Sequence, residues 1–306
     1  HGKHIITTSI DHSAMSKTFL QLEKEGFEIT RLPVSPEGEI NLADFKSALR
    51  EDTILVSIMY VNNEIGSINP IDEIGREILK WRKRAGVQYP LFHTDACQAA
   101  TTEELGVEKL HVDLLSLNGA KIYGPKGVGV LYKRRGVELE PIVFGGGQEF
   151  GLRSGTENVA AISGMARALE LVEAEKVGYA QKVESVRNYF WENLQKLEGV
   201  KLNGPNIGDI DTARSPANVN VSFIGVDAEA LVLYLDEYGI MCSKGSACET
   251  ESGGSHVLEA IGLSADEIRG AVRFTLGKHT TKKDIDYVMK FLPGIVSVLR
   301  GDPAAE

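Results

Sequence analysis

Ser116-Leu117-Asn118-Gly119-Ala120-Lys121-Ile122-Tyr123-Gly124-Pro125-Lys126-Gly127 is the most informative stretch of the sequence. It follows a mostly apolar run at residues 112–115, which is typical of a buried strand. The glycines and the proline predict a turn directly after that strand, so Lys121 is expected at the strand's carboxyl end. Because ligands of open α/β sheets bind at this end of the strands, we expect a binding site around Lys121.

The first half of the chain alternates strand-like runs with helical patterns. This alternation predicts an α/β domain with a largely parallel sheet. The expected strands are residues 4–9, 53–60, 89–94, 112–116 and 127–132, and the expected helices are residues 14–25, 42–49 and 71–84.

The second half has a different pattern. Residues 158–197 are helical almost throughout, with an expected break at Val177-Gly178. This break predicts the boundary between a large domain, residues 1–176, and a smaller C-terminal α+β domain, residues 177–306. The expected elements of the smaller domain are residues 218–223, 228–238, 240–242, 256–261, 271–276 and 282–298.

Composition excludes several classes of protein. With 42% hydrophobic and 25% charged residues, the chain has the composition of a soluble globular protein. The net charge of -10 argues against direct binding of nucleic acid or a membrane surface. No apolar run is long enough for a transmembrane helix and no signal peptide is recognisable, so a cytoplasmic location is expected.

The cysteines are few and odd in number: Cys97, Cys242 and Cys248. Such a set favours free thiols in a reducing compartment over disulfides. Cys248 lies in a run of small, polar and glycine residues, where a solvated thiol can ionise and attack. The alternative interpretation, an exposed bystander cysteine, is not excluded by this run alone.

An acid follows another expected strand. In His93-Thr94-Asp95-Ala96-Cys97-Gln98, Asp95 is expected at the strand's carboxyl end. A lysine that binds the cofactor and an acid that pairs with a pyridine nitrogen are what a pyridoxal phosphate enzyme requires. The triple His93, Asp95 and Cys97 also suggests a metal site. However, side chains at i and i+2 of one strand do not converge into a closed tetrahedral site, so we disfavour the metal.

Several motifs together resemble one family, the cysteine desulfurases of the NifS and IscS type within the fold type I pyridoxal phosphate superfamily. The resemblance implies a large domain with a mostly parallel sheet of the seven-stranded type. The motifs occur in the family's order: Asp11-His12, Val61-Asn62-Asn63-Glu64-Ile65-Gly66, residues 93–98 and 121–127, Gly145-Gly146-Gly147-Gln148-Glu149, Arg153-Ser154-Gly155-Thr156, residues 245–248 and Arg273-Phe274.

The resemblance implies roles for individual residues. Lys121, rather than Lys126, would bind pyridoxal 5'-phosphate covalently and move a substrate proton. Asp95 would pair with the pyridine nitrogen. Gln98 and Asn63 would contact the phenolic oxygen of the ring. His12 would stack on the ring and handle protons.

Further roles concern the substrate and the cofactor phosphate. Arg273 would hold the substrate carboxylate, together with Asn63, because a guanidinium binds this planar anion with two hydrogen bonds. Thr156 would reach the cofactor phosphate of a neighbouring subunit in a homodimer. Asn118 stands where the family has serine and can donate to a phosphate, whereas Ala120 stands where the family has histidine and cannot.

The implied activity is that of a cysteine desulfurase. L-Cysteine and the thiol of Cys248 would give L-alanine and a persulfide on Cys248, for delivery to an iron-sulfur scaffold or a tRNA-thiolation enzyme. A selenocysteine or cysteine lyase is one alternative. Another is a catalytically impaired fragment that acts as an assembly subunit. The fragment is considered because the family's N-terminal phosphate-binding turn is absent from this sequence, which predicts weak cofactor binding.

Overall fold

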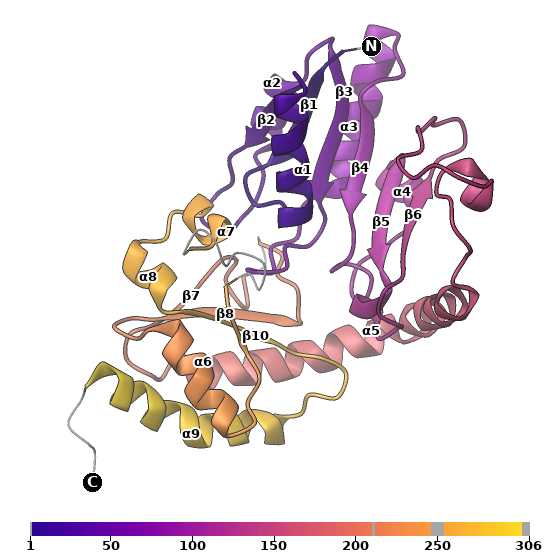
Figure 1. Ribbon diagram of the computed structural model, residues 1–306. Coiled ribbons are helices and arrows are strands. Elements are labelled where there is room, and N and C mark those ends of the chain that lie inside the picture. Colours follow the sequence, from indigo (N-terminus) through magenta and orange to yellow (C-terminus); the bar gives the residue numbers. More distant parts are fainter. Residues whose placement is uncertain (1, 210–211, 246–253, 302–306) are drawn as a thin grey trace.

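The computed structural model describes residues 2–209, 212–245 and 254–301. Cys248 therefore lies outside the described residues. The molecule has two parts, each built on its own sheet, and one long helix runs from the first part to the second (Figure 1).

The larger part is a six-stranded sheet. Its strands are β1 (His4–Thr8), β2 (Glu28–Leu32), β3 (Thr53–Met59), β4 (Leu91–Asp95), β5 (Leu114–Asn118) and β6 (Gly129–Lys133). The order is β2-β1-β3-β4-β5-β6, and all neighbours are parallel except β5 and β6. The five predicted strands and the mostly parallel sheet are confirmed. Within the described ranges this sheet has one strand fewer than the seven-stranded type implied by resemblance.

Strand β2 was not predicted. In its sequence Glu-Ile-Thr-Arg-Leu, Leu32 is the one fully buried residue, because β2 lies at the edge of the sheet. An edge strand of this kind lacks the continuous apolar run of a central parallel strand.

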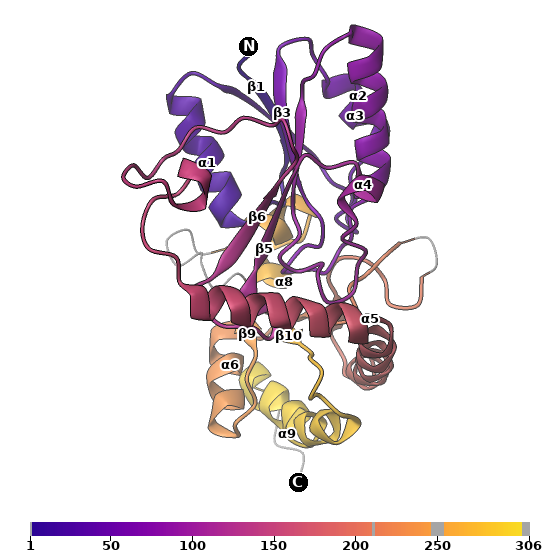
Figure 2. The ribbon, with the colours of Figure 1, turned by 90° about the vertical axis from the view of Figure 1, so that its right-hand side faces the viewer.

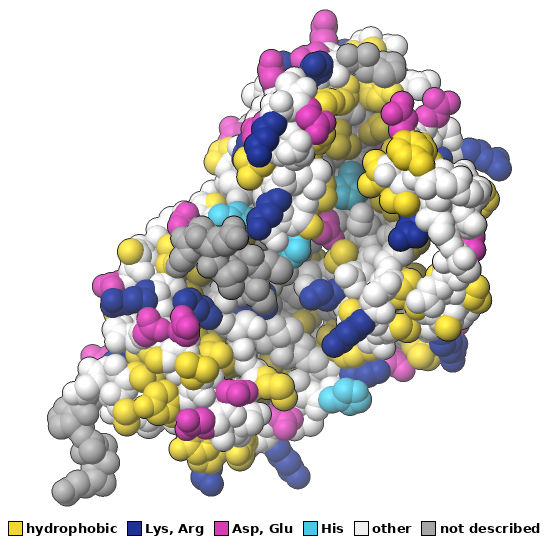
Figure 3. All heavy atoms as spheres, viewed as in Figure 1, with side chains coloured by type: hydrophobic (Ala, Val, Ile, Leu, Met, Phe, Trp, Pro, Cys, Tyr) yellow, Lys and Arg dark blue, Asp and Glu magenta, His cyan; other side chains and the backbone are white. Residues whose placement is uncertain are grey.

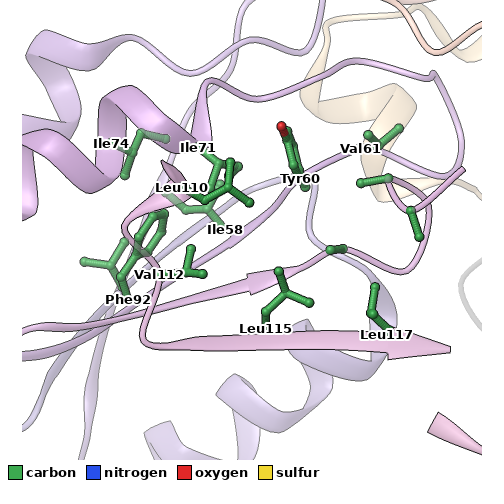
Figure 4. Close-up of a cluster of buried hydrophobic side chains, with 14 of the residues drawn as sticks. Ile58, Tyr60, Val61, Ile71, Ile74, Phe92, Leu110, Val112, Leu115 and Leu117 are labelled. Atoms are coloured by element: carbon green, nitrogen blue, oxygen red, sulfur yellow. The ribbon is translucent and has the colours of Figure 1, made fainter. Parts of the chain in front are cut away.

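Helices cover both faces of the large sheet. Helix α1 (Ser13–Lys24) lies on one face, and α2 (Leu42–Ala48) and α3 (Ile71–Ala85) lie on the other (Figure 2). Helix α3 buries Ile71, Ile74 and Ile78, which are spaced to share one side of the helix. They pack with Phe92 and Val112 in the core shown in Figure 4. The short helix α4 (Val107–Leu110) precedes β5.

The predicted helix break at Val177-Gly178 is wrong. Helix α5 (Val159–Leu194) is continuous for 36 residues. Val177 is 71% exposed, and a Cβ on Gly178 would have no atom within 4 Å, so this pair faces solvent. An exposed glycine weakens a helix by about 1 kcal/mol relative to alanine without ending it.

The small part is a four-stranded antiparallel sheet between helices. Its strands are β7 (Val200–Leu202), β8 (Asn218–Phe223), β9 (Ser243–Lys244) and β10 (Ala271–Thr275), in the order β7-β8-β10-β9. Strand β9 follows the expected element at residues 240–242. The helices are α6 (Ala228–Glu237), α7 (His256–Ala260), α8 (Ala265–Arg269) and α9 (Lys282–Arg300).

Helix α5 belongs to two hydrophobic cores. Met165 and Ala168 pack in the core of the large sheet, and Val183 and Phe190 pack in the core of the small sheet. This change of core supports our proposal of a domain division at residue 176. Among the described helices, none is long and apolar enough to cross a membrane.

Candidate active site

Lys121 lies where the sequence predicts, in a turn directly after β5. The turn is a 3-10 helix (Gly119–Ile122), and Asn118 caps it because its Oδ1 accepts a hydrogen bond from the Ala120 N–H at 2.9 Å. The side chains of Lys121 and Lys126 are both exposed. The amine of Lys121 is therefore open to solvent in this chain.

Tyr123 ties the lysine turn to the small domain. It has left-handed backbone geometry, with φ of 62°, and ends the turn. Its hydroxyl accepts a hydrogen bond from the Lys278 N–H at 3.0 Å and lies 3.4 Å from the Tyr179 hydroxyl on α5. The ammonium of Lys278 lies 4.6 Å from the centre of the Tyr123 ring. These contacts hold the lysine turn against α5 and against the segment that follows β10.

Asp95 is the last residue of β4, the strand that pairs with β5. It is the sheet partner of Ser116, and its Oδ1 accepts a hydrogen bond from the Cys97 N–H at 2.9 Å. Burial raises the pKa of the Cys97 thiol, Asp95 raises it further, and the positive charge of Lys121 acts in the opposite direction. Asp95 and Lys121 therefore both lie within electrostatic range of Cys97, which stays protonated at neutral pH.

His93 has a structural role. Its ring nitrogens lie 2.8 Å from the Ser57 hydroxyl and 2.9 Å from the Ser116 hydroxyl. Burial lowers the pKa of His93, so the ring is neutral. Within the described residues no cluster of three or more histidine, cysteine and acidic side chains is suited to a metal ion.

His12 begins helix α1 near the same edge of the sheet. Its Nδ1 accepts a hydrogen bond from the Ala14 N–H at 3.2 Å, so the proton of the neutral ring is on Nε2. The preceding Asp11 is buried and accepts a hydrogen bond from the Thr7 hydroxyl at 2.5 Å. Burial raises the pKa of Asp11 to about 7; the Thr7 hydrogen bond opposes this shift, and the charge of Asp95 adds to it. The sequence motif Asp11-His12 predicts no role for Asp11.

Arg273 comes to this edge from the other domain. Its neighbours Val272 and Phe274 point into the core of the small sheet, so Arg273 points to the opposite face, as strand alternation predicts. Its Nη1 donates to the Asn63 carbonyl oxygen at 2.9 Å. Asn63 is half-buried in the turn after β3, and Gln98 is half-buried in the turn after β4.

Thr156 is exposed in the segment that precedes α5. Within the described residues no hydrogen bond or ion pair joins it to the other predicted site residues. The face of the molecule in Figure 3 is hollowed between the two parts, and lysine, arginine and histidine side chains gather around the hollow.

Comparisons with known proteins identify the family of this chain. Residues 1–288 match the Aminotransferase class-V family. The chain is 45% identical over 302 residues to the cysteine desulfurase IscS of Dictyoglomus turgidum, an alignment that covers 98% of this chain and 73% of that protein. The chain belongs to the cysteine desulfurases.

Two solved structures agree with this membership. A NifS-like protein superposes with a TM-score of 0.88 at 36% sequence identity. The match covers 98% of this chain and 76% of that protein. A structure of SspA in complex with cysteine has a TM-score of 0.74 at 34% identity, with coverage of 92% and 75%. The resemblance and the α/β fold type are thereby confirmed.

Cysteine desulfurases are pyridoxal phosphate-dependent enzymes, and the residues of this member fit that cofactor. The edge of the sheet offers an exposed amine on Lys121, a carboxylate on Asp95 and an imidazole on His12. These are the groups needed for covalent attachment, for a pyridine nitrogen and for stacking. The Oδ1 of Asn118 is engaged in capping the turn, and Ala120 adds no side-chain donor.

Proposed function

We propose that this chain converts L-cysteine to L-alanine and holds the released sulfur as a persulfide on Cys248. The principal support is that Lys121 and Asp95 lie at the ends of neighbouring strands, both within electrostatic range of Cys97. The membership of the cysteine desulfurases gives the reaction type.

Substrate binding is assigned to Arg273 and Asn63. The Arg273 guanidinium is directed by its hydrogen bond to the Asn63 carbonyl and binds the substrate carboxylate. The cysteine bound in the related SspA structure supports L-cysteine as the substrate class.

The other residues hold the cofactor and move protons. Bound pyridoxal phosphate supplies an electron sink that weakens the bonds at the substrate's α-carbon. Lys121 would attach the cofactor and accept the α-proton. Asp95 would keep the pyridine nitrogen protonated, and Gln98 and Asn63 would contact the phenolic oxygen. His12 would pack on the ring with its Nε2 proton available for transfer.

Cys248 is assigned as the sulfur acceptor. Burial raises the pKa of Cys97 beyond that of an ordinary thiol, and burial raises the pKa of Cys242 to about 11. Neither of these thiols is a good nucleophile at neutral pH. The thiolate of Cys248 attacks the substrate sulfur, an S–S bond forms, and the C–S bond breaks. The electron pair of that C–S bond stays on the substrate's β-carbon, which takes up a proton. The α-carbon regains the proton held by Lys121, and alanine is formed.

The assembly we propose is a cytoplasmic homodimer that passes sulfur to an acceptor protein such as an iron-sulfur scaffold or a tRNA-thiolation enzyme. Thr156 would contact the cofactor phosphate of the neighbouring subunit. Large apolar side chains are exposed near Thr156 in the sequence, which supports burial of this segment in a subunit interface. They are Ile142, Phe144, Phe150 and Val159.

The Cys248→Ser variant tests this function. We expect it to keep the absorbance of bound pyridoxal phosphate and to lose persulfide and sulfide formation, because a hydroxyl does not accept sulfur. Cys97→Ser and Cys242→Ser are the matched controls and should retain most of the activity. Mass spectrometry locates the persulfide, and a persulfide on Cys97 would contradict the assignment.

A further inference from the structure

A row of side-chain donors joins the small sheet to the turn after β3. Arg273 donates to the Asn63 carbonyl at 2.9 Å. The amides of Asn218 and Asn220 both donate to the next carbonyl, that of Glu64, at 2.9 and 3.0 Å. Since Arg273 and Asn220 are partners in the β8–β10 pair, the donors stand side by side. Two consecutive peptide groups of the large domain thus rest on the sheet that carries Arg273.

The amides of this row are held at both ends. The Asn218 Oδ1 accepts from the Arg214 guanidinium at 3.0 Å, and the Asn220 Oδ1 accepts from the Asn203 amide at 2.8 Å. All four residues are buried. Because each amide uses its oxygen and its nitrogen, its orientation is determined, and a satisfied buried network of this kind is rigid.

Glu64 brings a third segment of the small domain to the same turn. Its carboxylate accepts a hydrogen bond from the Ser255 hydroxyl at 2.5 Å, although the residue is only 2% exposed. Ser255 also caps helix α7, accepting from the Leu258 N–H at 3.2 Å. At Gly66, where φ is +75°, a Cβ would lie 2.9 Å from the Asn218 Cβ, so the turn packs directly on β8.

We propose that Glu64 is a positioning residue for the substrate-carboxylate site, an inference that rests on the proposed function of Arg273. A buried carboxylate is costly to desolvate and is retained where its hydrogen bonds set a geometry. Glu64 holds the turn after β3 against β8 through its carbonyl and against α7 through its carboxylate. This turn directs the Arg273 guanidinium through the Asn63 carbonyl. Because a guanidinium binds a carboxylate through two parallel hydrogen bonds, a displaced Arg273 guanidinium binds the substrate carboxylate more weakly.

The test uses L-alanine, which carries the same carboxylate as cysteine but has no sulfur to transfer. Its binding to the cofactor-loaded protein is measured by calorimetry, and the KM and kcat for L-cysteine are measured separately. For Glu64→Ala and Ser255→Ala we expect the alanine Kd and the cysteine KM to rise about tenfold while kcat changes by less than about threefold, the pattern of lost ground-state binding. Ser255→Thr restores a hydroxyl and should bind alanine like the wild type.

Ser264→Ala is the matched control. Ser264 caps helix α8 as Ser255 caps α7, accepting from the Glu267 N–H at 3.4 Å. Its hydroxyl donates to the Glu267 carboxylate at 2.7 Å, whereas the Ser255 hydroxyl donates to Glu64. Its alanine Kd should be unchanged. Equal rises of the alanine Kd in Ser255→Ala and Ser264→Ala would overturn the proposal, because the loss of a helix cap alone would then explain both. An unchanged alanine Kd in Ser255→Ala also overturns it, and this variant carries the test if Glu64→Ala does not fold.

Failure of the proposed function gives a different result. If the wild type binds alanine but forms none from cysteine, desulfurase activity is refuted, and the alanine Kd values still test Glu64. If Arg273→Ala binds alanine normally, the assignment of Arg273 is refuted. If the wild type and Arg273→Ala behave as proposed while Glu64→Ala and Ser255→Ala bind alanine normally, the positioning role alone is refuted.

Discussion

Two lysines five residues apart in the same motif are both exposed, so burial does not distinguish Lys121 from Lys126. Their backbone positions do. Lys121 is inside the turn capped by Asn118, directly after β5, whereas Lys126 follows the left-handed Tyr123 and precedes β6. The end of a strand next to Asp95 is where the cofactor is expected to attach.

Lys121→Ala should therefore abolish turnover and the absorbance of covalently bound cofactor, and Lys126→Ala should leave the absorbance in place. The spectra of both variants after addition of pyridoxal phosphate give the answer. A cofactor linkage in Lys121→Ala that borohydride reduces to a stable bond would show that another lysine is used.

Asp11 predicts a pH dependence of stability. Burial raises its pKa to about 7 in the folded chain, from an ordinary value of 3.8. Between these values the folded state binds the extra proton, so the free energy of unfolding falls as the pH rises from about 4 to about 7. Asp11→Asn removes this loss. We expect Asp11→Asn to have a higher free energy of unfolding than the wild type, measured with urea, and the difference to be larger at pH 8 than at pH 5. An equal difference at both pH values would contradict the raised pKa of Asp11.

At the scale of secondary-structure elements, α5 departs most from expectation. The pair Val177-Gly178 resembled a break because it combines a β-branched residue with glycine, both weak helix formers. In the structure the helix continues, since each half of α5 is packed on a core of its own. Tertiary packing therefore overrides the local propensity.

Gly178→Ala tests the continuity of α5. Because its Cβ would have no atom within 4 Å, we expect the variant to gain about 0.5–1 kcal/mol in the free energy of unfolding. Gly164→Ala in the same helix is the control and should lose stability, because its Cβ would lie 2.7 Å from Pro125 Cγ. Denaturant unfolding measures both, and a loss of stability in Gly178→Ala would argue against a continuous helix.

At the scale of the whole molecule, the proposed dimer predicts that each site is shared. Thr156 is exposed, and no hydrogen bond or ion pair among the described residues joins it to Lys121. If Thr156 serves the neighbouring subunit, a hybrid of Lys121→Ala and Thr156→Ala chains contains one site with both residues intact. We expect the hybrid to regain up to about half of the cofactor absorbance and activity of the wild type, whereas each parent is impaired.

Differently tagged chains, refolded together and purified through both tags, provide that hybrid. Activity no higher than the mean of the two parents would show that Thr156 acts within its own subunit, or not at all.

The sequence by itself determined the strands of the large sheet, apart from β2, and the position of Lys121 at a strand end. These features depend on neighbouring residues, since periodic burial and turn chemistry operate over a few positions. The contact of Arg273 with Asn63, the buried hydrogen bond of Glu64 with Ser255 and the continuity of α5 could not be read from such patterns. They join segments up to 210 residues apart, or depend on two separate cores, so they follow from how the domains pack.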